Sequence, residues 1–133
     1  MLNIAIIGAG PAGLAAALRL HQQGFSPTIY ETVPELKPLG VGLDVKVYGT
    51  LEFEQLGLLE EFRAISVDAE QSIFYNKYGQ EIYAELCGVH MGYLHEQRFV
   101  HRGELQMLLY RAVIERLGAD AVVNGARATG YSQ

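Results

Sequence analysis

The sequence predicts an α/β fold built around a parallel sheet, and three neighbouring segments support this prediction. Residues 2–7 are apolar and rich in β-branched side chains without polar alternation, which is typical of a strand covered on both faces. Residues 11–23 are rich in Ala and Leu, which favour a helix, and residues 28–31 form a second short strand. Strand, helix and strand in this order make a βαβ unit, whose two strands lie parallel.

The ends of the first helix carry their own signals. Pro11 suits the first helical turn, because the N–H group that proline lacks would have no partner there. Gly24 suits the residue that ends the helix in a left-handed conformation. The helix is therefore expected to begin at Pro11 and to end just before Gly24.

The later elements are predicted from turn residues and apolar periodicity. Residues 103–117 are predicted to form a helix, because their apolar side chains recur at helical spacing. The apolar face consists of Leu105, Leu108, Leu109, Ala112 and Val113. We also expect a loop over 34–42, a helix over 51–65 that breaks near Gly57, a hairpin of strands 72–76 and 81–86, a loop over 87–99, a strand over 121–124, and the start of another strand in 127–131.

Length and composition limit the function classes. The chain has 133 residues, the size of one domain, and 50% of them are hydrophobic, which is enough for a core. The net charge is -5 without a basic cluster, so nucleic-acid binding is not expected. Cys87 is the only cysteine, which excludes an intrachain disulfide and suits a reducing compartment.

The apolar N-terminal run does not have the pattern of a targeting or membrane segment. Residues 4–18 are fewer than the roughly 20 needed to span a bilayer, no cationic region precedes them, and glycines interrupt them. We therefore expect a cytoplasmic protein with no membrane span.

A glycine-rich motif lies between the first strand and the first helix. In the sequence Gly-Ala-Gly-Pro-Ala-Gly, Gly8 permits a tight turn, Gly10 lets the backbone approach a pyrophosphate, and Gly13 allows close packing of helix on strand. The free N–H groups and positive dipole end of the helix attract the pyrophosphate. The motif predicts a Rossmann-like FAD/NAD(P)-binding fold.

Glu31 strengthens this interpretation. It ends the second strand eighteen residues beyond Gly13, where a carboxylate accepts hydrogen bonds from an adenosine ribose. A carboxylate there also disfavours a ribose 2′-phosphate, which argues against NADP as the ligand of this site. The alternative is a glycine-rich turn with an unrelated surface glutamate.

Three segments in the right order resemble class A, single-component FAD monooxygenases, the flavoprotein aromatic-ring hydroxylases. Residues 8–31 resemble their FAD fingerprint, and residues 38–42 with 56–58 resemble their GxG…LGL segment. Residues 100–109, VHRGELQMLL, resemble their hR-x-x-L element. The amino-acid sequences of the second and third segments most resemble those of the phenazine-carboxylate hydroxylase branch of this family.

Arg102 also stands out on physical grounds, because it begins a helix, where the dipole favours anions over cations. A bound diphosphate would remove this conflict, and the resemblance implies that Arg102 contacts FAD; the alternative is a solvated side chain. Lys37 matches a basic position of the family more weakly. The motif and the resemblance together imply cofactor contacts at Gly8, Gly10, Pro11, Ala12, Gly13, Glu31, Lys37, Gly42 and Arg102.

Two departures from the family bear on the function. The family's proline after Gly42 is replaced, and the segment reads Asp44-Val-Lys-Val-Tyr-Gly49, which weakens the helix start beside the expected flavin ring. The chain also ends before the family's DG and GD elements. We therefore expect residues 1–133 to be the N-terminal part of a single FAD-binding domain, with an incomplete sheet and a hairpin excursion over about 70–100.

The resemblance implies a monooxygenase in which NAD(P)H reduces FAD and the reduced flavin uses oxygen to hydroxylate a small aromatic substrate. The flavin supplies this chemistry, so no residue is assigned as catalytic, and no metal site is expected from the four scattered histidines. The isolated chain is expected to be inactive. Two alternatives stay open: another Rossmann oxidoreductase, such as an NAD-dependent dehydrogenase, flavin reductase or amine oxidase, and a truncated, non-catalytic nucleotide-binding fragment.

Overall fold

The structure is a computed structural model that describes residues 2–132. Its residues form two compact units. Of the described residues, 2–40 and 102–132 form unit 1, and Val41–His101 form unit 2.

Unit 1 contains the predicted βαβ unit and a second crossover. In chain order its elements are β1 (Ala5–Ile7), α1 (Pro11–Gln22), β2 (Thr28–Tyr30), α4 (Arg102–Leu117), the 3-10 helix η2 (Ala119–Ala121) and β8 (Val122–Val123). The strands form a parallel sheet in the order β1-β2-β8, with Ile6 opposite Ile29 and Ile29 opposite Val122. The prediction of a Rossmann-like α/β fold with a parallel sheet is confirmed.

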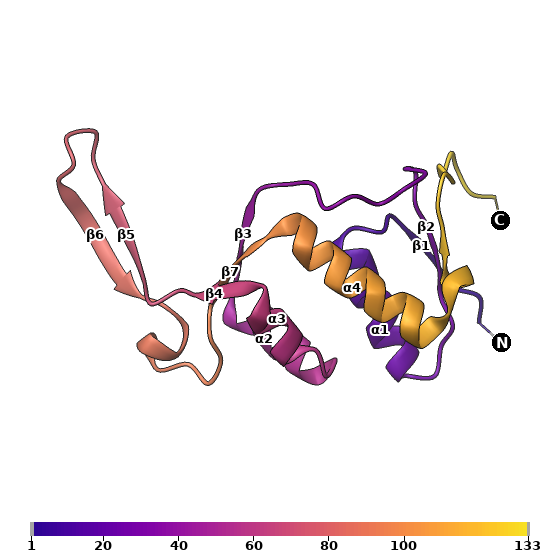
Figure 1. Cartoon of the computed structure of the whole chain (residues 1–133), viewed down its shortest axis with the longest axis horizontal. Helices are drawn as coiled ribbons and strands as arrows, with labels where there is room; N and C mark the ends of the chain where they lie inside the picture. The colour runs from indigo at the N-terminus through magenta and orange to yellow at the C-terminus, as the bar shows by residue number, and fades with distance from the viewer. Residues whose placement is uncertain (1, 133) are drawn as a thin grey trace. The chain divides into compact units, whose positions relative to one another are not determined.

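Two helices build the core of unit 1. Helices α1 and α4 lie side by side, and α1 also contacts β1 and β2 (Figure 1). Leu14, Leu18 and Ile29 are at most 1% exposed, so one face of the sheet is closed. The predicted apolar face of α4 is confirmed, because each of its members is at most 4% exposed: Leu105, Leu108, Leu109, Ala112 and Val113.

Two expectations for unit 1 are wrong. Strand β1 was expected to be covered on both faces, but Ile7 is 64% exposed and Ala5 is exposed as well. The β-branched composition identifies a strand, but it does not tell whether a second layer packs on it. Residues 127–131 form no strand.

Unit 2 contains a three-stranded antiparallel sheet and a separate hairpin. Its elements are β3 (Gly42–Val45), α2 (Val47–Gln55), α3 (Leu59–Ala64), β4 (Ser66–Asp68), β5 (Gln71–Tyr75), β6 (Glu81–Leu86), the 3-10 helix η1 (Gly88–Met91) and β7 (Arg98–His101). The sheet has the order β3-β7-β4, and β5 pairs with β6. The predicted hairpin and the helix break at Gly57 are confirmed, whereas β3, β4 and β7 were not predicted.

The core of unit 2 joins helices α2 and α3. The rings of Phe53 and Phe62 stack with their centroids 4.1 Å apart, and Phe62 is fully buried. Beside them Arg98 lies against the end of α3, where its Nε donates to Ser66 Oγ at 2.7 Å. Its Nη2 donates to the carbonyl oxygen of Ser66 at 2.9 Å. An arginine thus satisfies backbone groups where the helix gives way to β4.

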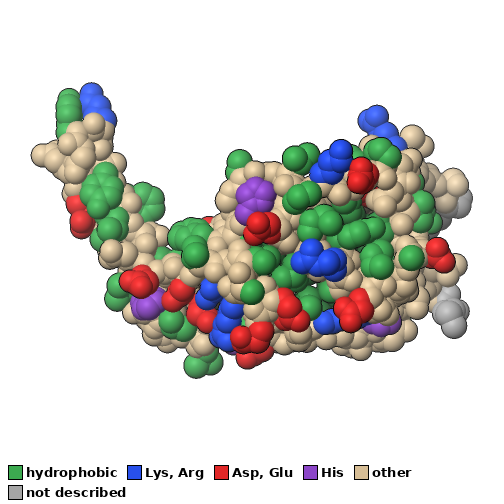
Figure 2. Space-filling model, in the orientation of Figure 1, with side chains coloured by type: hydrophobic (Ala, Val, Ile, Leu, Met, Phe, Trp, Pro, Cys, Tyr) green, Lys and Arg blue, Asp and Glu red, His purple; other side chains and the backbone are tan. Residues whose placement is uncertain are grey.

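The surface carries both charge signs and some apolar side chains. Acidic and basic side chains are interspersed on the face of the molecule in Figure 2. Hydrophobic side chains are exposed on the β5–β6 hairpin, among them Phe74, Ile82 and Leu86. Within residues 2–132, no helix has the length and the apolar composition needed to cross a membrane.

Candidate functional site

The glycine motif forms the turn from β1 into α1. Gly8 has a φ of 99°, a conformation that favours glycine, and its N–H donates to the Tyr30 carbonyl at 2.8 Å. Gly10 precedes α1 as its N-cap and provides no side-chain cap. The first helical hydrogen bond runs from Leu14 N–H to the Gly10 carbonyl at 3.0 Å. Among the described residues, the N–H groups of Ala12 and Gly13 ahead of it have no backbone acceptor, so they are available to an anion.

The Glu31 carboxylate lies directly against this turn. Its Oε2 accepts the Ala9 N–H at 2.7 Å, and its Oε1 accepts the Val33 N–H at 3.0 Å. The hydrogen bond from the Val33 N–H is the largest cause that lowers the pKa of Glu31, and partial burial opposes it. The Ala9 and Thr32 N–H groups lower the pKa further. Glu31 is therefore held as an anion, and an ionised carboxylate has further lone pairs for ligand hydroxyls.

The lowered pKa of Glu31 predicts a pH dependence of stability. A carboxyl group with a depressed folded-state pKa stabilises the fold above its unfolded pKa of about 4.3. This contribution is lost as the pH falls through the lower folded-state value. Glu31→Gln should therefore remove this part of the decrease in folding stability at acidic pH. The test is chemical denaturation of both chains between pH 7 and pH 3, and identical pH profiles would contradict it.

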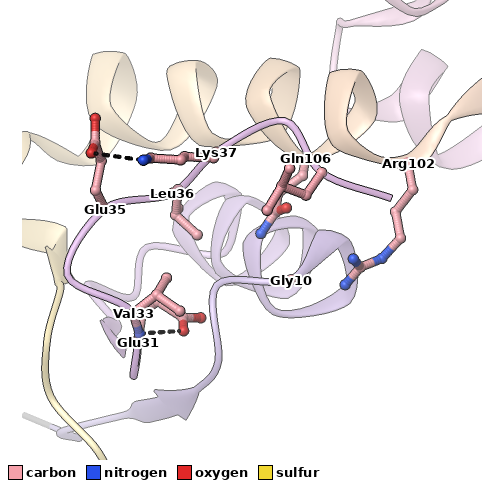
Figure 3. Close-up of a pocket in the computed structure, with 9 residues that line it drawn as sticks. Gly10, Glu31, Val33, Glu35, Leu36, Lys37, Arg102 and Gln106 are labelled. Atoms are coloured by element: carbon pink, nitrogen blue, oxygen red, sulfur yellow. Dashed lines mark hydrogen bonds and ion pairs between the residues drawn. The ribbon is translucent and has the colours of Figure 1, made fainter. Parts of the chain in front are cut away.

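Arg102 is the first residue of α4, and its guanidinium points toward the Gly10 turn (Figure 3). A Cβ atom on Gly40 would lie 3.0 Å from Arg102 Cβ, so the backbone at Gly40 packs against the stem of the arginine. Within residues 2–132, no ion pair or hydrogen bond engages the guanidinium. An unpaired cation at the positive end of a helix is electrostatically unfavourable, and a bound anion would relieve it.

These groups line one pocket of unit 1 with a volume of about 280 Å³. Gly10, Glu31, Arg102 and Gln106 lie on one side, and the strap, residues 33–39, contributes Val33, Glu35, Leu36, Lys37 and Leu39. A carboxylate, an unpaired guanidinium and the Gly10 backbone thus lie around a single space (Figure 3), next to the first turn of α1 with its free N–H groups. The arrangement can bind a ribose hydroxyl and a phosphate group of the same ligand.

The structure brings most predicted site residues together. Gly10, Glu31, Lys37 and Arg102 line the pocket, while Gly8, Pro11, Ala12 and Gly13 form the adjoining turn and first turn of α1. Lys37 is directed toward Glu35, with Nζ 3.8 Å from its Oε2, rather than toward Gly10 (Figure 3). Gly42 opens β3 in unit 2 and does not line this pocket.

Gln106 is a pocket residue that sequence reasoning missed. It is 7% exposed, and its Nε2 donates to the Ala9 carbonyl at 2.7 Å across 97 residues of sequence. A signal was present, because Gln106 is a polar residue next to the apolar face of α4. It also lies four residues beyond Arg102, so both side chains are on the same side of the helix.

Sequence comparisons identify relatives of the chain. Residues 6–36 match the family model described as NAD(P)-binding Rossmann-like domain. The chain is 39% identical over 130 residues to the phenazine 1,6-dicarboxylic acid hydroxylase PhzS of Lysobacter antibioticus, covering 97% of this chain and 32% of that protein. It is 30% identical over 134 residues to the FAD-dependent urate hydroxylase of Mycolicibacterium vanbaalenii, with the same 97% and 32% coverage.

The fold matches a known structure with similar coverage. The crystal structure of FqzB superposes with a TM-score of 0.81 at 24% identity, covering 99% of this chain and 30% of that one. The chain thus spans about a third of the length of the proteins it matches. Over 97% of its length the chain is thus similar to hydroxylases of phenazine and urate, and its residues 6–36 match a Rossmann-like dinucleotide-binding domain.

Proposed function

We propose that the chain is the FAD-binding portion of an NAD(P)H-dependent monooxygenase that hydroxylates a small aromatic substrate. The observation that carries the proposal is the unpaired Arg102 guanidinium facing the Gly10 turn in the same pocket as the ionised Glu31. This donor set fits the adenosine diphosphate half of FAD. The names of the relatives, phenazine and urate hydroxylases that the chain matches over 97% of its length, support FAD and an aromatic ring.

The residues of the pocket would each hold a different part of the cofactor. The N–H groups of Gly10, Ala12 and Gly13 would donate to the diphosphate, which Arg102 would neutralise. Glu31 would accept hydrogen bonds from the adenosine ribose hydroxyls. Pro11 would start α1 without adding a donor, Gly8 would keep the turn tight, and Lys37 would add positive charge at the pocket rim.

The bound flavin would supply the redox chemistry, taking a hydride from NAD(P)H and using oxygen to convert an aromatic C–H into a phenol and water. The described residues of the pocket bind and orient, and none of them is proposed as an acid or base of this reaction. We propose further that both units belong to one FAD-binding domain. Residues 70–100 would be an excursion toward the substrate, and Gly42 would be a further cofactor-binding residue.

The test is a titration of the 15N-labelled 133-residue chain with FAD, ADP, NAD+ and NADP+, followed by NMR so that weak binding is also detected. FAD and ADP should shift the amide resonances of Ala12 and Gly13 at saturating concentrations, with NADP+ binding more weakly because Glu31 repels its 2′-phosphate. Shifts with NAD+ at lower concentration than with FAD would favour a dehydrogenase. No shift with either FAD or ADP would overturn the proposal.

Removing the charge of Arg102 should weaken ligand binding without unfolding the chain. Hydrogen bonds to charged groups contribute about 1.5–3 kcal/mol, so Arg102→Met should raise the dissociation constant for ADP about 10- to 100-fold. The difference should shrink at high salt, which screens the charge. Arg111→Met is the matched control, because Arg111 is an exposed arginine of the same helix that does not line the pocket. Equal affinities of the two variants would contradict the assigned role of Arg102.

A further inference from the structure

The peptide groups on either side of Ala9 are held by side chains from distant parts of unit 1. Ala9 is fully buried, so its N–H and carbonyl need partners inside the protein. Glu31 Oε2 accepts the N–H at 2.7 Å, and Gln106 Nε2 donates to the carbonyl at 2.7 Å. The glycine turn is therefore fixed on one side by Glu31, which directly follows β2, and on the other side by Gln106 of α4.

We propose that Gln106 is a positioning residue of the dinucleotide site, which aims the Gly10 N–H at the ligand diphosphate by holding the Ala9 carbonyl. The inference rests on the function proposed above. The Ala9 carbonyl and the Gly10 N–H belong to the same trans peptide group, so they point in opposite directions in one plane. A hydrogen bond that fixes the carbonyl oxygen therefore also fixes the direction of the N–H, and Gly10 lines the pocket.

The amide of Gln106 is suited to this role in chemistry and in placement. Only its NH2 group can donate to a carbonyl, so the contact with Ala9 determines which end of the amide faces the turn. Figure 3 shows the side chain reaching from α4 toward the Gly10 turn, beside that of Arg102. One face of α4 thus supplies two functions, a cation that touches the ligand and an amide that orients the backbone donor.

The proposal is tested with Gln106→Met, which keeps the length of the side chain and removes the donor. Gln97→Met is the matched control, because Gln97 is also 7% exposed and donates one side-chain hydrogen bond, to Asp44 at 3.1 Å in unit 2. In the ligand-free chain, Gln106→Met should move the Gly10 amide resonance and speed its hydrogen exchange. Gln97→Met should leave both unchanged. A lost positioning contact should weaken ADP binding about tenfold.

The outcomes separate this inference from the proposed function. A Gly10 amide unchanged in ligand-free Gln106→Met overturns the positioning role, whatever the chain binds. If the wild-type chain binds FAD or ADP and Gln106→Met binds it equally well, the positioning role alone is overturned. If the wild-type chain binds neither, the proposed function has failed and the positioning role fails with it.

A measurement on the wild-type chain covers the case in which Gln106→Met does not fold. The side-chain amide protons of Gln106 should exchange slowly, and a scalar coupling should connect Gln106 Nε2 with the carbonyl carbon of Ala9 across the hydrogen bond. Both signals should persist when ADP is bound. Rapid exchange with no coupling would overturn the inference without any variant.

Discussion

Gly13→Ala should unfold unit 1 or destabilise it by about 3 kcal/mol or more, which is the upper range for overpacked sites. A Cβ atom on Gly13 would lie 2.1 Å from the Gly8 carbonyl oxygen and 3.2 Å from Ile6 Cγ2. The nearest atom belongs to the backbone of the glycine turn, so no rotamer change can relieve the contact. Alanine gains about 1 kcal/mol over glycine within a helix, which is too little to offset the clash.

Gly10→Ala is the matched comparison, because it adds the same methyl group three residues earlier and is expected to have the opposite result. No atom lies within 4 Å of a Cβ built on Gly10, and its φ of -71° suits alanine. Replacing the N-cap glycine should cost at most about 1 kcal/mol. The methyl group would instead enter the pocket that Gly10 lines, so ligand binding should be lost while the fold is kept.

Thermal unfolding and ADP titration of the two variants together test this contrast. The expected result is a large loss of melting temperature for Gly13→Ala and a loss of ADP affinity at nearly wild-type melting temperature for Gly10→Ala. A Gly13→Ala chain as stable as the wild type would show that helix and turn do not pack as closely as the structure indicates. Tight ADP binding by Gly10→Ala would place the diphosphate elsewhere.

Local sequence patterns predicted the elements of unit 1 well, because each was specified by nearby residues. Pro11 and Gly24 marked the ends of α1, and the apolar repeat marked α4. The sheet of unit 2 was missed because its strands have only three or four residues, and β3 pairs with β7 across more than fifty residues of sequence. Such pairing is decided by tertiary contacts, which a local pattern does not contain.

The candidate site was predictable where a residue acts through its own chemistry. The glycine turn and Glu31 follow from the spacing of one motif, and Arg102 follows from a charge at the unfavourable end of a helix. The role of Gln106 was not predictable, because it depends on a hydrogen bond to Ala9, 97 residues away. The hydrogen bond from the Ala9 N–H to the Glu31 carboxylate was not predictable either. It uses one oxygen of the carboxylate to which the motif assigns the ribose.

Gly103→Ala should have its main effect on ligand binding, because it would push the strap away from α4. A Cβ atom on Gly103 would lie 2.2 Å from the carbonyl carbon of Pro38 and 2.6 Å from its Cα. The strap runs from Val33 to Leu39 and is mostly exposed, so it can shift at a cost of about 1–3 kcal/mol rather than unfold the unit. Its shift would open the pocket wall opposite Gly10 and release Arg102 from Gly40.

If the displacement of the strap and Arg102 weakens the binding free energy of ADP by about 2 kcal/mol, the dissociation constant rises about 30-fold. Faster proteolytic cleavage within residues 33–39 should accompany this loss, because the strap would no longer pack on α4. Glu104→Ala is the control, since it adds no atom and lies exposed in the same helical turn. Wild-type affinity and cleavage rate in Gly103→Ala would mean that the contact between Pro38 and α4 does not shape the pocket. Because the backbone of Pro38 packs directly against α4 at position 103, only glycine at this position lets the strap lie against the helix beside the pocket.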